Sequence, residues 1–253
     1  MDKRIVTGAL LTMIICLATP AWAGTWMDDF EDGNLDGWQM VDVAVLVGVV
    51  KEGQGTGKVE EKEGNLIVTD NNEAGGDFPT AAGFNNGQSN IKDFTLTVDA
   101  KIAKVTIPDL CFWYIQFRSG GDSFAVITYS VAQGSGTYSW LAIADIKTKF
   151  PIINYIGIVE SPFIFEIDKW YHIELSMKGS QAKVWVDKKL MWQADWKDLP
   201  EWLNESGQIF FAGWGMELHL DNFVLTSDDV PDVTSVNLKG KLPITWAKLK
   251  YAR

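Results

Sequence analysis

The chain of 253 residues is 47% hydrophobic and carries a formal net charge of −11 at pH 7. Binding of DNA or RNA requires a basic surface, so this acidic balance argues against a nucleic-acid partner. The length and the apolar content suit one large domain behind a short leader.

Residues 1–23 have the features of a secretory signal peptide. A basic start precedes an apolar stretch too short to span a bilayer comfortably, and Ala21-Trp22-Ala23 fits the small-x-small rule for cleavage. We expect cleavage after Ala23, a secreted protein (periplasmic or extracellular), and no transmembrane segment in the mature chain. An uncleaved anchor helix is the alternative. Only Cys111 remains after cleavage, so no disulfide can form within the mature chain.

An acidic segment near the start resembles the first half of an EF-hand calcium loop. It places oxygen-bearing side chains at alternate positions and ends on Gly37, which allows a sharp turn. The glutamate that would close such a loop is missing, and Asp42 is its candidate substitute. The predicted ligands of a structural Ca²⁺ are Asp32, Asn34, Asp36 and Asp42. Asp221 would approach them if the first and last strands pair. A turn stabilised by its own Asp and Asn side chains, without an ion, is the alternative.

Strand signals dominate the remaining sequence, with apolar and polar residues alternating between regularly spaced turns. The predicted strands are 94–102, 111–118, 123–131, 138–146, 170–177, 182–186, 190–192, 208–213 and 217–226. Residues 71–87 and 147–165 are predicted to be loops, and 199–203 is the one helix-like piece. Such a pattern predicts an all-β sandwich or barrel.

Several short motifs carry a resemblance to a known family over roughly residues 28–226. They are Asp-Phe-Glu-Asp-Gly from residue 29, Asp-Phe-x-Leu from 93, Trp-Tyr-His-Ile-Glu-Leu from 170 and Leu-Asp-Asn-Phe from 220. Their order is similar to that in the concanavalin A-like lectin/glucanase superfamily, in its laminin-G-like and 3-keto-disaccharide hydrolase-like branches. The resemblance implies a jelly-roll sandwich of two antiparallel sheets over residues 24–226, with the first and last strands adjacent. A galactose-binding-like jelly roll is the alternative fold.

The same resemblance implies a carbohydrate ligand but leaves catalysis open. Relatives in glycoside hydrolase family 16 use a strand with Glu-x-Asp-x-x-Glu. Glu166-Ile167-Asp168 begins that motif, but the second glutamate is absent. Retaining hydrolysis needs two carboxyl groups about 5 Å apart. We therefore expect a lectin-like binding protein rather than an enzyme, with Asp168 serving only to turn the chain. A glycoside hydrolase and a structural or adhesive surface module are the alternatives.

The aromatic segment 111–118 is the candidate sugar site. Alternate side chains of a strand share one face, and aromatic rings with Gln and Arg suit the C–H faces and hydroxyls of sugars. The predicted carbohydrate-binding residues are Tyr114, Gln116, Arg118, Tyr129, Trp140 and Trp214. For Tyr114 and Tyr129, a place in the core is the alternative. The expected partner is an oligosaccharide or a polysaccharide.

Two features remain. His172 and His219, the only histidines, are expected to be ordinary strand residues without a metal. Residues 227–253 form an acidic linker followed by a basic tail, in which Trp246 and Leu249 would share a face of a short helix. We expect this tail to contact a surface or a receptor, or else to be a disordered end.

Overall fold

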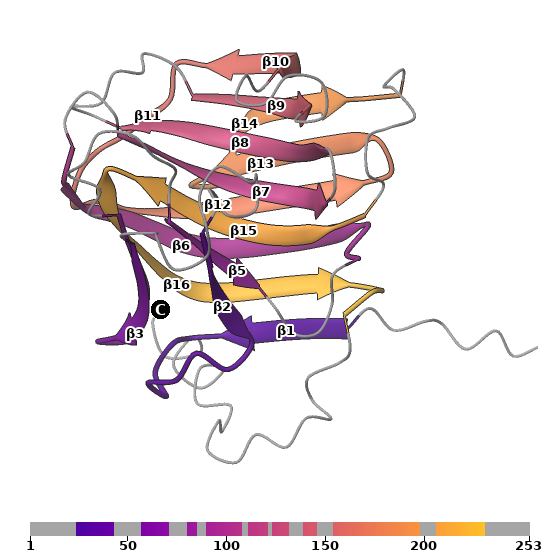
Figure 1. The fold of residues 1–253 in the computed structure, drawn as a ribbon. Coiled ribbons are helices and arrows are strands. Elements are labelled where there is room, and N and C mark those ends of the chain that lie inside the picture. The colour runs from indigo at the N-terminus through magenta and orange to yellow at the C-terminus, as the bar shows by residue number, and fades with distance from the viewer. Residues whose placement is uncertain are drawn as a thin grey trace, which may run out of the picture.

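The computed structural model describes residues 24–42, 57–70, 80–84, 90–107, 111–120, 123–131, 139–145, 154–197 and 206–230. This part of the chain forms sixteen strands and contains no helix (Figure 1). It accordingly includes no helix long and apolar enough to cross a membrane. The predicted leader, the helix-like piece at 199–203 and the basic tail lie outside the described residues.

The strands form two sheets of eight. The first, called the β6 sheet, has the order β14-β13-β12-β6-β16-β4-β3, with β1 also paired to β16. Its strands are β1 (Gly24–Asp28), β3 (Lys58–Lys62), β4 (Asn65–Thr69), β6 (Phe94–Val105), β12 (Trp170–Lys178), β13 (Gln181–Val186), β14 (Lys189–Asp195) and β16 (Met216–Ser227). The antiparallel pairing of β1 with β16, from Gly24 opposite Ser227 to Asp28 opposite Phe223, confirms that the first and last described strands are adjacent (Figure 1).

The second, called the β7 sheet, has the order β10-β9-β8-β7-β15-β5-β2, with the short β11 parallel to β8. Its strands are β2 (Trp38–Asp42), β5 (Thr80–Phe84), β7 (Phe112–Gly120), β8 (Ser123–Val131), β9 (Ser139–Asp145), β10 (Asn154–Ser161), β11 (Ile164–Phe165) and β15 (Gln208–Trp214). Apart from β11, every pairing in both sheets is antiparallel, as the sequence predicted.

Two of the predicted loops contain strands. Residues 80–84, Thr-Ala-Ala-Gly-Phe, form β5 between β15 and β2. Small residues have low strand propensity, so only the pairing with neighbours on both sides identifies this segment as a strand. Residues 154–161 and 164–165 form β10 and β11, with Pro162 between them rather than inside either strand. The expectation of continuous loops over 71–87 and 147–165 is therefore wrong for these stretches.

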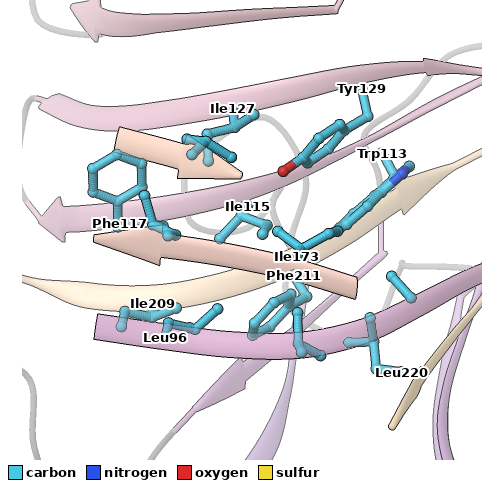
Figure 2. Packing of buried hydrophobic residues seen from close by; sticks show 14 of the residues in the cluster. Leu96, Trp113, Ile115, Phe117, Ile127, Tyr129, Ile173, Ile209, Phe211 and Leu220 are labelled. Atoms are coloured by element: carbon cyan, nitrogen blue, oxygen red, sulfur yellow. The ribbon is translucent and has the colours of Figure 1, made fainter. Parts of the chain in front are cut away.

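Alternation along the strands builds the core between the two sheets. Along β6, the side chains from Phe94 to Ile102 alternate between buried and at least partly exposed. From the β7 sheet, Trp113 and Tyr129 stack with ring centroids 4.3 Å apart, and Figure 2 shows them in the same interior layer as Leu96 and Ile173. Burying each such side chain contributes about 1.5–3 kcal/mol, which makes this layer the main source of stability.

The edge strand β10 contains a bulge. Its register against β9 shifts between Ile156 and Val159, and Gly157 lies in the bulge with φ +61°. A Cβ atom at Gly157 would lie 3.2 Å from Nε1 of the buried Trp196, so the close approach also favours glycine. β10 contacts β14 of the opposite sheet, so the two edge strands pack against each other on this side of the sandwich.

Arg118 ties the two sheets together at one end. It lies where β7 loses its regular register with β8, and its φ of +50° turns the side chain out of the strand's alternation. Its Nη2 donates to the Gly179 carbonyl at 2.7 Å and to Asp93 Oδ1 at 3.3 Å, and its Nε donates to the Lys92 carbonyl at 3.3 Å. The side chain is 5% exposed. A buried guanidinium with these acceptors joins β7 to the start of β6 and to the β12–β13 turn.

Replacing Arg118 by lysine should lower the free energy of unfolding by about 2–4 kcal/mol, because a single ammonium group cannot satisfy three acceptors on two separate segments. Urea unfolding followed by tryptophan fluorescence measures this change. Lys178→Arg, on the exposed end of β12, is the matched control and should leave the midpoint in place. An Arg118→Lys midpoint equal to that of the wild type would contradict the structural role.

Candidate functional site

The outer face of the β7 sheet carries a continuous aromatic layer. On β7 the side chains of Trp113, Ile115 and Phe117 point into the core, which leaves Phe112, Tyr114 and Gln116 on the opposite side. Neighbouring strands continue this face, because Ala212, Tyr114, Thr128 and Trp140 are successive cross-strand partners. We call it the aromatic face, and its members are Phe112, Tyr114, Gln116, Phe124, Val126, Thr128, Trp140, Tyr155, Phe210, Ala212 and Trp214.

The centre of the aromatic face is buried and holds neutral polar groups. Tyr114 is 7% exposed, with the similarly buried Gln116 and Thr128 beside it. Burial raises the pKa of Tyr114 well above its ordinary value, and the nearby Tyr155 and Asp70 raise it further. Burial raises the pKa of Tyr155 as well. Both phenols therefore stay protonated and can donate and accept hydrogen bonds.

Two aromatic pairs lie on either side of this centre. Trp140 and Tyr155 meet edge to face with ring centroids 4.6 Å apart, and Phe112 and Trp214 are 5.2 Å apart. All four side chains are partly exposed. Because β8 separates β7 from β9 and adjacent strands are about 4.8 Å apart, the strands that carry Phe112 and Trp140 lie roughly 10 Å apart. The arrangement offers two apolar ring surfaces with hydroxyl and amide groups between them.

The structure brings together four of the six predicted sugar-site residues and places two elsewhere. Tyr114, Gln116, Trp140 and Trp214 share the aromatic face. Tyr129 does not, because it pairs with Trp113 and therefore points inward, where it is fully buried (Figure 2). Arg118 does not either, because the irregularity at the end of β7 turns it toward Gly179 and Asp93. Their predicted positions on this face are wrong.

Sequence reasoning missed other members of the face. Tyr155 falls in a segment that was expected to be a loop, and Thr128, not Tyr129, is the cross-strand partner of Tyr114. The bounds of β8 were predicted, but the face on which each of its side chains lies depends on the turn that joins it to β7. Asp70 follows β4 and is 1% exposed, and its Oδ2 accepts a hydrogen bond from the Gly215 backbone N–H at 2.9 Å. No local motif marks Asp70 as a neighbour of Tyr114.

Carboxylates are scarce on the central strands of this sheet. The sequences of β7, β8 and β15 contain no aspartate or glutamate. Glu166 and Asp168, the start of the broken hydrolase motif, lie in the turn between β11 and β12. Glu166 pairs with Lys169 at 2.6 Å, and Asp168 pairs with Lys101 at 3.4 Å. The hydrogen bond from Lys169, followed by that from Tyr171, lowers the pKa of Glu166. The expectation that Asp168 turns the chain is confirmed.

The acidic segment predicted to bind calcium forms a loop between β1 and β2. Asp28 fixes its ends, because Oδ1 accepts from the Phe30 N–H and Oδ2 accepts from Trp38 Nε1, each at 3.0 Å. Gly37 has φ +90°, and a Cβ there would lie 2.5 Å from a ring carbon of Trp26. The turn that the sequence assigned to this glycine is thus present.

The four predicted calcium ligands are arranged differently from those of an EF-hand. Asp32 Oδ1 and Asn34 Oδ1 each accept a backbone N–H two residues ahead, at 3.4 Å and 2.8 Å, and Asp36 is exposed. Asp42 ends the extended strand β2, roughly 13 Å beyond Trp38, and its side chain lies outside the described residues. The described part of the chain contains no group of three or more His, Cys, Asp or Glu side chains with metal-site geometry.

Acidic charge instead gathers around the loop between β1 and β2, next to carboxylates on β3 and β16. Burial raises the pKa of Asp221 to about 6, and Asp99, Glu31 and Asp29 raise it against the lowering effect of the Asn222 N–H. Burial likewise raises the pKa of Glu61 to about 7, with Asp28 and Asp32 adding to it and the Gly33 N–H opposing it. The approach of Asp221 to this acidic segment, expected if the end strands pair, is therefore present.

Both histidines lie on strands of the β6 sheet and pair with carboxylates. His172 Nδ1 is 2.6 Å from Asp99 Oδ1 on β6, and His219 Nε2 is 2.7 Å from Glu217 Oε1 on its own strand. β6 separates the two histidine-bearing strands, so the histidines do not form one site.

No protein-family model matches the sequence, and no curated protein is significantly similar to it. Solved structures do match. The carbohydrate-binding module CBM66 from Bacillus subtilis has a TM-score of 0.51 at 14% identity, over 77% of this chain and 98% of that one. The family GH16 endo-β-1,3(4)-glucanase SCLam has a TM-score of 0.57 at 12% identity, over 83% of this chain and 92% of that one. The κ-carrageenase of Pseudoalteromonas carrageenovora has a TM-score of 0.50 at 10% identity, over 85% and 99%.

At these identities the likeness establishes the fold alone. The protein has a concanavalin A-like sandwich of two antiparallel sheets, as the sequence predicted. Among the solved structures with this architecture are a carbohydrate-binding module and GH16 glycoside hydrolases, so one fold supports both binding and catalysis.

The raised pKa values of Glu61 and Asp221 predict that stability falls as pH rises. The folded state binds more protons than the unfolded state between about pH 3.8 and 7, so the free energy of unfolding decreases through that range. Thermal unfolding in chelator should therefore give a lower Tm at pH 8 than at pH 5.5. Glu61→Gln and Asp221→Asn should each reduce the difference, whereas Asn34→Ser, a neutral change in the same region, should not. A Tm that rises from pH 5.5 to pH 8 would contradict this.

Proposed function

We propose that the protein is a secreted, lectin-like carbohydrate-binding sandwich of the laminin-G-like kind, which holds an oligosaccharide or a polysaccharide on its aromatic face. The observation that carries this proposal is the placement of two partly exposed aromatic pairs on either side of Tyr114, Gln116 and Thr128. In the secreted form, cleavage after Ala23 would leave Gly24, the first residue of β1, at the N-terminus.

The chemistry of the face fits sugar rings. Aromatic faces stack on the C–H surfaces of sugars, while phenol, amide and hydroxyl groups exchange hydrogen bonds with sugar hydroxyls. The separation of roughly 10 Å between the strands that carry Phe112 and Trp140 favours a chain of several sugar units over a single ring. Trp140 and Tyr155 would hold one part of such a chain, and Phe112 with Trp214 another.

The distribution of carboxylates favours binding over cleavage. Glycoside hydrolysis usually needs two carboxyl groups about 5–10 Å apart on either side of the scissile bond. The three central strands of the aromatic face supply none, and the broken Glu-x-Asp motif lies in a turn with both carboxylates paired to lysines. A hydrolase of the 3-keto-disaccharide hydrolase-like type is the alternative, and an assay for released sugar tests it.

Trp140→Ala should weaken glycan binding about threefold to tenfold, because one aromatic contact contributes roughly 0.5–1.5 kcal/mol beyond its buried area. A glycan microarray identifies the ligand, and isothermal titration measures its affinity. Trp170→Ala is the matched control, since Trp170 is exposed on β12 of the other sheet and should leave affinity unchanged.

Three results would count against this function. Equal losses in the Trp140 and Trp170 variants would place the ligand elsewhere. Release of reducing sugar, abolished by a single Asp or Glu substitution, would make the protein an enzyme. No binding to any glycan would favour a structural or adhesive surface module.

We also propose that a structural Ca²⁺ draws together the carboxylates at the acidic junction of the end strands, which by themselves form no metal site among the described residues. Asp221 and Glu31 would be its main ligands, with Asp32, Asn34 and Asp36 beside them. The carboxylates that raise the pKa of Asp221 need a counter-charge once they are all ionised, and hard oxygen ligands suit calcium. Asp42, at the far end of β2, would not take part.

Calcium at 100 times its Kd should stabilise the protein by about 2.7 kcal/mol at pH 8, measured as a rise in Tm over a sample in chelator. Asp221→Asn should abolish the rise, and Asp36→Asn should reduce it only slightly. If Asp36→Asn abolishes the rise in Tm and Asp221→Asn does not, the result would favour the ligand set predicted from the sequence. The same Tm with calcium and with chelator would contradict the proposal that a structural Ca²⁺ binds.

A further inference from the structure

We propose that the aromatic face selects uncharged glycan chains and rejects sulfated or uronic acid-containing ones. This inference rests on the proposed function and specifies the ligand class of the same face. It follows from the charges that the two sheets carry and from where each charged side chain lies.

The β7 sheet is almost free of basic residues. Across its eight strands the only lysine or arginine is Arg118. The β6 sheet, in contrast, carries lysines at 58, 62, 101, 104, 178, 183 and 189. Sulfate and carboxylate groups are recognised chiefly by the charge-assisted hydrogen bonds of arginine and lysine. The strands that form the aromatic face therefore have one candidate cation.

That cation is committed elsewhere. The Arg118 guanidinium donates to the carbonyl oxygens of Lys92 and Gly179 and to the Asp93 carboxylate, and its side chain is 5% exposed. These partners lie at the start of β6 and in the β12–β13 turn, both in the other sheet. The positive charge of Arg118 is therefore neutralised away from the aromatic face. A ligand on this face meets no basic side chain from the described strands.

The charges near the face are negative instead. Asp70 is 1% exposed, and it lies close enough to Tyr114 to raise the pKa of that phenol. On β10, the exposed Glu160 is the cross-strand partner of Trp140. Carboxylates near the centre of the face and beside Trp140, in a chain of net charge −11, would repel an anionic polysaccharide.

The groups in the middle suit neutral hydroxyls. Tyr114, Gln116 and Thr128 present a phenol, an amide and an alcohol, and each of these can both donate and accept a hydrogen bond. Tyr155 adds a second protonated phenol. A sugar hydroxyl also donates and accepts, whereas a sulfate ester only accepts and would bring a charge into a buried surface without a counter-ion.

The experiment compares glycans that share a backbone and differ in charge. Sulfated κ-carrageenan oligosaccharides are matched with the same oligosaccharides after desulfation, and carboxymethylated β-1,3-glucan with laminarin, on a microarray that also carries a broad set of neutral, anionic and cationic glycans. At low salt we expect neutral ligands to bind at least about tenfold more tightly than their anionic counterparts. Added salt should narrow that ratio by screening the carboxylates.

Glu160→Lys supplies the internal test. It should strengthen binding of the anionic member of a pair severalfold at low salt, leave the neutral member nearly unchanged, and lose its effect at high salt. Lys178→Glu, which changes a charge by the same amount on the other sheet, is the control and should not alter the ratio.

The outcomes separate this inference from the proposed function. Equal or tighter binding of the sulfated or uronic ligand, still dependent on Trp140, would overturn the selectivity and leave the glycan-binding function intact. Tightest binding to a cationic glycan such as a chitosan oligosaccharide would also overturn it. Binding to no glycan, or binding independent of Trp140, would overturn the proposed function and this inference with it.

Discussion

The register that joins β7 to its neighbours is the constraint on which both the core and the aromatic face depend. Every residue of β8 is buried, so this strand has no solvent face to tolerate an error. One set of side chains, including Trp113 and Tyr129, packs against the β6 sheet, and the alternate set, including Tyr114 and Thr128, forms the other layer. Because side chains alternate with period two, a slip of one residue would exchange the layers completely. The core therefore fixes the site, since the energy that orients Trp113 inward also orients Tyr114 outward.

The same dependence on strand pairing explains which features of the structure could be predicted from the sequence and which could not. Alternation and turn residues predicted the bounds of β8 and the hairpins around β12 and β13, because these are local properties. The assignment of Tyr129 failed because parity between two strands is a property of their pairing. The placement of Arg118 on the same face as Tyr114 was wrong because an irregularity at the end of β7 interrupts the alternation on which that prediction depended. β5 was missed because alanine and glycine carry no strand signal of their own, and a neighbour on each side supplies the pairing.

The acidic junction shows in the same way that spacing along the chain does not determine which side chains lie close together in space. The calcium motif was identified from positions counted along the chain, and its middle members hold turns through backbone hydrogen bonds. The carboxylates that influence one another most come from opposite ends of the sequence, because β1 pairs with β16 and brings Asp221 toward Glu31. Long-range pairing of this kind assembles charge that no local window contains. It also couples the closure of the sandwich to the ionisation of those groups.

The bulge in β10 has a consequence for how copies of the protein meet. An open edge of a sheet is a template on which another chain can add a strand, and flat edges lead to fibrous assembly. In β10, the shifted register and the left-handed Gly157 interrupt the repeat of hydrogen-bonding groups along that edge. An incoming strand cannot pair continuously with it. Encounters between molecules at this edge therefore do not grow into an extended sheet, and copies of the protein can lie side by side at high local concentration without joining their sheets.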